Sequence, residues 1–415
     1  MALRNKLTGV LLAATTILSA TSALAGEITF WSWRQEDKAA YAEYIKDFNK
    51  KNPDVTVKFE AFEPTQYQTI LSTALAAGKG PDVIQVRAYG NLESVAKPGY
   101  LLPLDETNVP ELKGFPAAAL KAETMRSDNK LYAVPFASQT MLILYNKDLF
   151  AKNGINEPET WDELVEASKK LKAAGLMPFG NGTATAWQNE TIVSALLSSL
   201  LGKQFEADLL SGKATFEDKR FVDALTKLND LAQAYFPPSF VGIDYASSQQ
   251  LFIAGRAAMF AGGSFEAANF LRQNPTLKIG VFTPPPAKKG DDKLVGVYYD
   301  GGYAINAKSE KQADALKFLR FLATKDFGDK FANGLSNISP IPGVTFTDPI
   351  LAEVADLNKS SIPYLFLVHF RYQEPSGSVL IQAGVQKLLA GKATAAEIGA
   401  EVTKGIATYY EPFKK

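Results

Sequence analysis

The chain has 415 residues, no cysteine and one histidine, with 44 basic against 44 acidic side chains. This length predicts two domains, and the even charge argues against nucleic acid or an anionic membrane surface as a partner. The lack of cysteine excludes a thiolate metal site and a Cys-His catalytic dyad. A Ser-His-Asp triad would need His369, and the sequence contains neither a Gly-x-Ser-x-Gly elbow nor a phosphate-binding loop. No metal or cofactor is therefore expected.

The first 25 residues predict a secretory signal peptide. Arg4 and Lys6 precede an apolar run through Leu18, and a small-x-small cleavage motif follows at 23–25. The run is shorter than the ~20 residues that a membrane span requires, which disfavours an anchor helix. Cleavage removes two of the 44 basic residues, so 42 basic and 44 acidic residues remain, a net charge of −2. With no cysteine to carry a lipid anchor, the predicted location is the periplasm.

Strand and helix patterns alternate after this leader. Short β-branched and aromatic runs predict strands, and apolar residues at helical spacing predict helices between them. The expected elements are a strand at 27–33, a helix over 41–48 that ends at 52–54, a strand at 55–62, a helix at 67–78 and a strand at 81–86. This order predicts an α/β fold with a mainly parallel sheet and helices on both faces.

Three later segments predict helix starts. Each has Ser or Thr followed three residues later by Glu or Gln, the pattern of a capping box that satisfies backbone N–H groups of the first turn. The segments begin at Thr160, Ser309 and Thr394. Trp161 falls in the first turn of the first helix, so we expect it to be structural.

Polar and aromatic side chains gather where the first and third strands end. Ligands of open α/β sheets bind beyond the carboxyl ends of the strands. An aromatic ring can stack on a pyranose, while amide, carboxylate and guanidinium groups bind its hydroxyls. The candidate ligand-binding residues at these ends are Trp33, Arg34, Gln35, Glu36, Arg87 and Tyr89. Trp31, inside the strand, is expected to be core, and Trp33 fits either core or a ligand platform.

Four blocks of sequence follow one another in the order of a known family. They are GPDVIQVRAYGNLESVAKPGYLLPLD (80–105), LYAVPFASQTMLILYNKDLFAKNGINEPETWDEL (131–164), FIAGRAAMFAGGSFEAANF (252–270) and QKLLAGKATAAEIGAEV (386–402). Together they resemble the extracellular solute-binding proteins of ABC importers, in the sugar-binding family related to maltose-binding protein. The chain departs from the family at Phe265, where tryptophan is usual. It also has arginine and tyrosine after the third strand, where maltose-binding relatives carry an Asp-Arg pair, so maltose is not the expected ligand.

The resemblance implies two α/β lobes, each a mainly parallel sheet flanked by helices, which close on a ligand by a hinge motion. The chain crossings between lobes are expected near Pro135–Thr140, Asp300–Gly302 and Ser339–Ile341. The implied N-lobe is 26–136 plus 301–338, and the implied C-lobe is 137–300 plus 339–415.

Carried over position by position, the resemblance also implies further cleft residues. These are Gln139, Trp187, Gln188, Phe265, Glu266, Asp300, Gly301, Arg371 and Tyr372. Trp187 lies in a glycine- and threonine-rich loop, which favours a ligand platform, whereas Phe265 and Tyr303 fit lobe core equally well. If the arginines at 34, 87 and 371 converge, they indicate an acidic group on the sugar.

The implied function is that of the periplasmic binding component of an ABC-type carbohydrate importer. Such a protein, expected to be a monomer without enzyme activity, captures a sugar, oligosaccharide or sugar derivative and delivers it to the membrane permease. Two other classes remain open. A ferric-ion binding protein of similar architecture would use the phenolates of Tyr298 and Tyr299, with His369 as its one imidazole. A secreted glycosidase would need two carboxylates ~5 or ~7–9 Å apart.

Overall fold

The computed structural model describes residues 26–414, and the predicted signal peptide at 1–25 lies outside them. The strands are β1 (Gly26–Ser32), β2 (Val55–Ala61), β3 (Val83–Arg87), β4 (Val134–Asn146), β5 (Met177–Phe179), β6 (Ala257–Gly263), β7 (Ile279–Phe282), β8 (Val295–Ile305) and β9 (Ser361–Pro363). The α-helices are α1 (Lys38–Lys51), α2 (Tyr67–Ala76), α3 (Gly90–Ala96), α4 (Ala117–Ala122), α5 (Lys147–Lys152), α6 (Trp161–Ala173), α7 (Ala186–Leu210), α8 (Lys219–Tyr235), α9 (Tyr245–Ile253), α10 (Glu266–Gln273), α11 (Gln312–Leu322), α12 (Lys325–Leu335), α13 (Pro349–Leu357), α14 (Leu365–His369), α15 (Gly377–Leu389) and α16 (Ala395–Ala407). Within the described residues, no helix has both the length and the apolar character needed to cross a bilayer.

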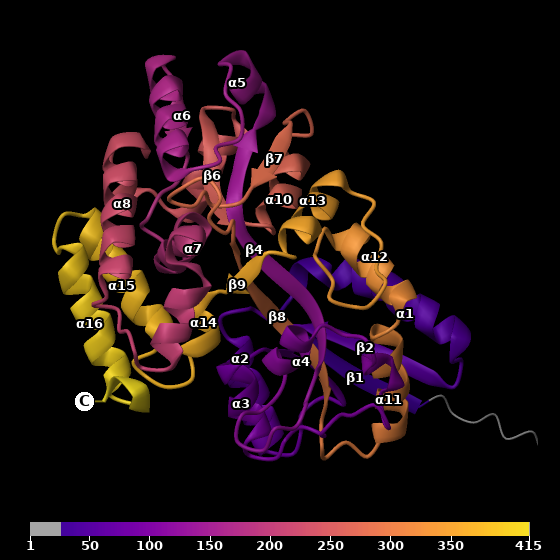
Figure 1. Cartoon of the computed structure of the whole chain (residues 1–415). Helices are drawn as coiled ribbons and strands as arrows, with labels where there is room; N and C mark the ends of the chain where they lie inside the picture. Colours follow the sequence, from indigo (N-terminus) through magenta and orange to yellow (C-terminus); the bar gives the residue numbers. More distant parts are fainter. Residues whose placement is uncertain (1–25, 415) are drawn as a thin grey trace, which may run out of the picture.

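Two long strands, β4 and β8, run through the middle of one sheet and connect its two halves (Figure 1). The strand order is β2-β1-β3-β8-β4-β6-β5, and β7 pairs with β4 while β9 pairs with β8. All 13 residues of β4 are buried. At about 3.3 Å per residue this strand extends roughly 40 Å, which is enough to pass from one half of the molecule into the other.

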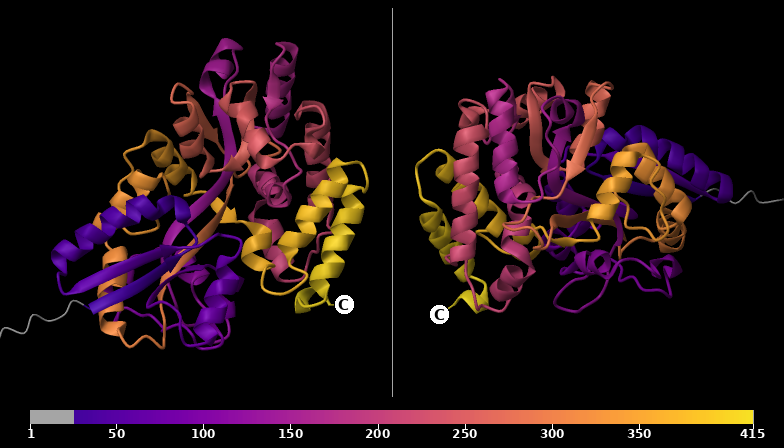
Figure 2. Two further views of the ribbon diagram at one scale, coloured as in Figure 1. Left: turned by 180° about the vertical axis from the view of Figure 1, so that it is seen from behind. Right: turned by 45° about the horizontal axis from the view of Figure 1, so that its top comes forward.

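Separate groups of buried apolar side chains form the interiors of two lobes. One group draws on residues 28–137 and 303–341, and packs β1, β2 and β3 against α1, α2 and α11. The other groups draw on residues 141–295, on Ile338 and on residues 351–413. Seen from behind, α15 and α16 lie on the second lobe, far from β1 and β2 (Figure 2). We call these the N-lobe and the C-lobe.

The five elements predicted from the first part of the chain are confirmed. The three strands are β1, β2 and β3, and the two helices are α1 and α2. The cap of α1 is Asn52, directly before a proline that cannot continue a helix. After α2, Gly78 has a φ of 68°, a left-handed conformation that glycine adopts without the Cβ clash that other residues suffer.

The sheet is mixed: the strand pairs of the N-lobe are mainly parallel, as predicted, whereas antiparallel pairs around β4 dominate in the C-lobe. β1 is parallel to β2 and β3, and β5 is parallel to β6. In contrast, β8 is antiparallel to β3 and β4, and β4 is antiparallel to β6 and β7. The reason is that β4 carries the chain from the N-lobe into the C-lobe and β8 carries it back alongside.

Two of the three predicted helix starts are confirmed. Thr394 forms a reciprocal capping box at α16, and Thr160 accepts a hydrogen bond at 3.3 Å from a first-turn N–H of α6. Trp161 is buried at the start of α6, as expected. The prediction at Ser309 is wrong, because α11 begins three residues later and has no side-chain cap. The Ser309 hydroxyl accepts from the Lys311 N–H at 3.0 Å and donates to Asp82 Oδ1 at 2.6 Å.

The three segments predicted as chain crossings lie side by side. Within β4, Ala137 pairs with Gly301 of β8 next to a β-bulge. The adjacent Ser138 N–H donates to the Ile338 carbonyl at 2.8 Å. Ile341, which the predicted boundary assigns to the C-lobe, packs in the N-lobe core. The third crossing therefore extends beyond the boundary at 339.

Candidate ligand-binding site

Two cavities lie where the lobes meet, and four of the predicted ligand-binding residues line each of them. The Arg87 cavity measures about 80 Å³, and its walls include Arg87, Tyr89, Tyr298, Tyr299, Asp300 and Arg371. The Gln139 cavity measures about 530 Å³, and its walls include Arg34, Glu36, Gln139, Phe265, Asn337 and Asp348.

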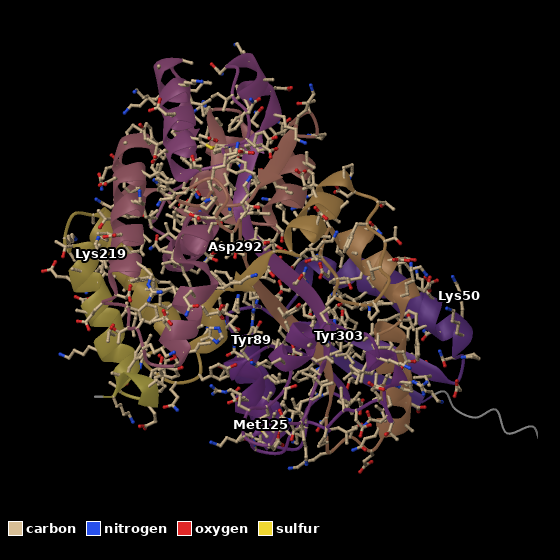
Figure 3. All side chains as sticks on the ribbon, viewed as in Figure 1. Lys50, Tyr89, Met125, Lys219, Asp292 and Tyr303 are labelled. Carbon is tan, nitrogen blue, oxygen red and sulfur yellow. The ribbon has the colours of Figure 1, made fainter. Side chains whose placement is uncertain are left out.

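The Arg87 cavity takes its walls from both lobes. Arg87 ends β3 and Tyr89 follows it in the N-lobe, Arg371 follows α14 in the C-lobe, and Tyr299 belongs to β8. Tyr89 lies near the junction of the lobes (Figure 3) and has a φ of 59°, which is uncommon outside glycine. Its hydroxyl accepts a hydrogen bond from the Tyr299 N–H at 3.1 Å. A tertiary contact thus holds a strained loop residue, a combination that concentrates at binding sites.

Arg34 links the two cavities but is itself bound by carboxylates. Its guanidinium contacts Asp37 and lies 3.5 Å from Asp300, which lines the Arg87 cavity. Burial opposes the charge of Arg34, yet the two aspartates outweigh burial and raise the pKa of the guanidinium. Arg34 therefore fixes the position of Asp300 in the cavity wall, and its role as a ligand contact stays a prediction.

Trp33 supports the site from beneath, which differs from the expectation for the tryptophan pair. Its side chain is 4% exposed and lies 5.8 Å from the Tyr67 ring and 5.9 Å from the Phe136 ring. The Arg87 guanidinium lies 4.5 Å from the Trp33 ring, a cation–π contact. Trp31, expected to be core, is only half-buried and packs against Phe62. The reversal arises because Trp33 lies beneath the loop that follows β3.

The Gln139 cavity places an amide between the lobes. The Gln139 side chain is buried, and its Oε1 accepts a hydrogen bond from the Ser264 hydroxyl at 3.3 Å. Its Nε2 donates to Asn337 Oδ1 at 3.4 Å. Phe265 lines the cavity at the start of α10, and Glu36 lines it from the N-lobe. The weak, long hydrogen bonds leave the amide able to exchange partners with a polar ligand.

Trp187 stands at the surface of the C-lobe beside other aromatic rings. It is 40% exposed, and its ring lies 4.6 Å from the Tyr245 ring and 6.4 Å from the Phe265 ring. The Tyr245 hydroxyl donates to Glu266 at 2.8 Å, and Gln249 donates to the same carboxylate at 2.6 Å. Glu266 is buried, so it fixes the aromatic group from below.

A family model described as bacterial extracellular solute-binding protein matches residues 31–328. The chain belongs to this family. Its members are substrate-binding proteins, which is the class that the resemblance of the four sequence blocks implied.

Relatives of this solute-binding protein span most of its length. A multiple sugar-binding protein of Streptococcus mutans is 28% identical over 328 residues, which cover 77% of this chain and 76% of the relative. A structure from work on xylan utilization by Caldanaerobius polysaccharolyticus has a TM-score of 0.76 and 27% identity, and covers 91% of this chain and 98% of that one. A family 1 extracellular solute-binding protein of Bifidobacterium longum subsp. infantis has a TM-score of 0.73 and 26% identity, and the match covers 92% of this chain and 99% of that one. These similarities confirm the two-lobed fold.

Several predicted site residues of the solute-binding protein lie away from both cavities. Gln35 is exposed, and Gln188 is buried in the C-lobe with its amide donating to Ser248 at 3.1 Å. Gly301 is buried where a Cβ would lie 3.0 Å from the Trp33 ring. The Arg126 guanidinium carbon lies 3.2 Å from the centre of the Tyr372 ring, a cation–π contact between the lobes. Their roles as ligand contacts stay predictions.

Three residues near the site were missed by sequence reasoning. Asn91 lines the Arg87 cavity, and the strand-end rule that selected Arg87 and Tyr89 would also have reached it. Tyr245 and Asn337 carry no such signal. They begin or follow helices far along the chain, and only tertiary packing brings them beside Trp187 and Gln139.

The Glu266 carboxyl predicts a pH dependence of stability. Burial raises the pKa of Glu266 from 4.5 to about 7, although hydrogen bonds from Gln249 and Tyr245 act to lower it. Between pH 4.5 and pH 7 the folded protein holds a proton on Glu266 that the unfolded chain has released. The contribution of this carboxyl to the free energy of unfolding is therefore complete below pH 4.5 and is lost as pH rises through 7. The difference corresponds to about 3 kcal/mol. Urea unfolding at pH 5 and pH 8 should show a smaller fall in stability for Glu266→Gln than for wild type, and equal falls would contradict this assignment.

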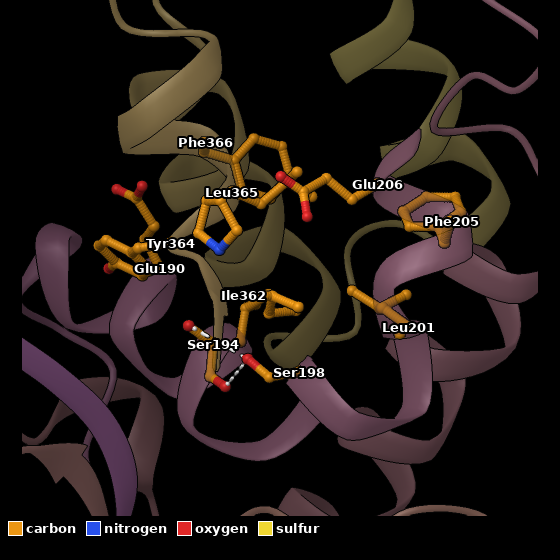
Figure 4. A pocket seen from close by; sticks show the side chains of 13 residues that line it. Glu190, Ser194, Ser198, Leu201, Phe205, Glu206, Ile362, Tyr364, Leu365 and Phe366 are labelled. Carbon is orange, nitrogen blue, oxygen red and sulfur yellow. Dashed lines mark hydrogen bonds between the residues drawn. The ribbon is translucent and has the colours of Figure 1, made fainter. Parts of the chain in front are cut away.

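A third cavity lies inside the C-lobe between α7 and the segment around α14 (Figure 4). It measures about 20 Å³, enough for a single water molecule. Ser194 and Ser198 lie on its wall, and the Ser198 hydroxyl donates to the Ser194 carbonyl at 2.7 Å. This cavity is too small for a sugar.

The residues considered for iron are arranged differently from a metal site. Burial raises the pKa of both Tyr298 and Tyr299, which disfavours their phenolate forms. His369 Nε2 lies 2.8 Å from a Glu206 carboxylate oxygen. Within residues 26–414, no group of three His, Cys, Asp or Glu side chains is placed to hold a metal ion. The family match supports solute binding over the ferric-ion and glycosidase alternatives.

Proposed function

We propose that this solute-binding protein is the carbohydrate-binding component of an ABC importer. It captures a sugar, oligosaccharide or sugar derivative between its lobes and delivers it to the transmembrane permease. The observation that carries the proposal is a polar cleft between two lobes in a chain of this family. The name of the Streptococcus mutans relative, a multiple sugar-binding protein, supports carbohydrate as the ligand class.

The chemistry of the cleft fits a carbohydrate. Sugars present hydroxyl edges and apolar C–H faces, so a site needs hydrogen-bonding groups together with aromatic rings. The Gln139 amide and the Tyr89 and Tyr299 side chains supply the first kind of group. Phe265 and the partly exposed Trp187 supply the second.

Ligand binding should draw the lobes together, since contacts from both lobes favour the closed state. We place the hinges at the predicted crossings, with the N-lobe at 26–136 plus 301–338 and the C-lobe at 137–300 plus 339–415, except that the third crossing extends through Ile341, which packs in the N-lobe core. The protein acts in the periplasm as a monomer after cleavage of its signal peptide. It releases the ligand chemically unchanged.

A thermal-shift screen of residues 26–415 against mono- and oligosaccharides, polyols and sugar acids tests the function. A ligand at ~100 times its Kd stabilises the folded state by about 2.7 kcal/mol, which gives a clear rise in the unfolding midpoint. Trp187→Ala should reduce the rise for the same ligand and leave the midpoint of the free protein nearly unchanged, because the ring is partly exposed. No rise with any carbohydrate, or recovery of a chemically altered sugar, would contradict the proposal.

A further inference from the structure

Two arginines in the Arg87 cavity have no acidic partner. Arg87 reaches the wall from the N-lobe and Arg371 from the C-lobe. Neither forms an ion pair or a side-chain hydrogen bond with any residue in 26–414, whereas Arg34, the third predicted arginine, contacts two aspartates. Arg87 is partly buried and Arg371 is exposed. The Arg87 guanidinium, held in the cavity wall without a carboxylate, is a group prepared for an anionic ligand.

The charges of the wall leave an excess of one positive charge. Its charged side chains are Arg87, Arg371 and Asp300, so two positive charges face one negative charge. Asp300 already has a partner in Arg34, outside this wall. The nearby Glu190 accepts hydrogen bonds from Ser378 and Gln382 in the C-lobe and forms no ion pair with Arg371.

Trp33 holds Arg87 in place from below. The guanidinium lies 4.5 Å from the buried ring, and stacking on an aromatic face restricts a side chain that is otherwise flexible. A guanidinium that is oriented before binding loses less conformational freedom when it engages an anion. Trp33, for which the sequence left core and ligand platform open, therefore acts through the arginine.

We propose that the ligand of this cleft is an acidic sugar whose carboxylate is bound by Arg87 and Arg371 from the two lobes. This inference rests on the proposed function and specifies its substrate class. Planar guanidinium groups match the geometry of a carboxylate and bind it through paired N–H donors. A monoanion neutralises the excess charge of the wall, whereas a dianionic phosphate would reverse it. Closure of the lobes brings the two arginines onto the same group.

Calorimetric titration at pH 7.5 tests the substrate class directly. The panel consists of D-glucuronate, D-galacturonate, D-mannuronate and their disaccharides, each compared with its neutral parent sugar and with a hexose phosphate. At least one uronate should bind no less than tenfold more tightly than its parent. Arg87→Gln and Arg371→Gln should each weaken uronate binding at least tenfold, and raising salt from 50 to 500 mM should weaken wild-type binding more than that of either variant.

Arg256→Gln is the matched control, because Arg256 is exposed and has no ion pair among the described residues. It should leave uronate affinity unchanged, and circular dichroism should show that all three variants are folded. Tighter binding of a neutral sugar or of the hexose phosphate overturns the acidic-sugar proposal but leaves carbohydrate binding intact. If no uronate binds, the substrate class is equally wrong. Absence of binding to every saccharide in both screens overturns the proposed function itself.

Discussion

Replacing Trp33 with alanine is expected to lower the free energy of unfolding by about 3–5 kcal/mol, the cost of a large-to-small change in a packed core. Trp33 is 4% exposed and packs against Tyr67 and Phe136 in the N-lobe. A cavity left there cannot be filled by a loop that is already fixed by the Tyr89 contact with β8. Urea unfolding followed by circular dichroism measures the loss.

Trp31→Ala is the matched comparison for this prediction. Trp31 lies two residues away, inside β1, but its ring is half-buried and packs against Phe62. Its loss should cost no more than about 2 kcal/mol, because part of the apolar surface is exposed to water in the folded state. A larger loss for Trp31→Ala than for Trp33→Ala would reverse our assignment of the core residue.

Gly90→Ala is expected to raise the Kd for the ligand at least tenfold, which corresponds to about 1.4 kcal/mol. Gly90 begins α3 in the N-lobe, and a Cβ at this position would lie 2.4 Å from the Arg371 carbonyl oxygen of the C-lobe. Because both clashing groups include backbone, neither can rotate away. The lobes must separate instead, and the ligand then loses contacts from one of them.

Small-angle scattering and calorimetry together measure this effect. With saturating ligand, Gly90→Ala should keep a larger radius of gyration than the wild type, while the unfolding midpoint of the free protein changes little. Gly242→Ala is the control, because a Cβ at Gly242 would meet no atom within 4 Å. Wild-type affinity in Gly90→Ala would show that this contact between lobes plays no part in binding.

Local pattern predicted the elements of the N-lobe well. α1 and α2 were recognisable because their apolar residues recur at helical spacing and because Pro53 and Gly78 mark their ends. The prediction failed at Ser309, whose hydroxyl accepts from the Lys311 N–H in a local turn before α11 and donates to Asp82. A serine hydroxyl can form a short turn as well as a helix cap, and sequence spacing does not decide between them.

The candidate site was predicted in part. The strand-end rule located Arg87 and Tyr89, because the position of a loop after a strand follows from the strand pattern itself. The same rule does not indicate which arginine lacks a carboxylate partner. Arg34 follows the end of β1 and Arg87 ends β3, yet only Arg34 meets Asp37 and Asp300.

The sequence by itself determined the order of the N-terminal elements, the strand ends that carry polar side chains and, through its four blocks, the family. These depend on periodicity and on residues that are close in the chain. The tertiary structure alone decided the antiparallel path of β8, the burial of Trp33 rather than Trp31, and the meeting of Arg87 with Arg371. The physical reason is that these contacts join residues far apart in the chain, within one lobe for Trp33 and between lobes for Arg87 and Arg371, and no local pattern encodes them.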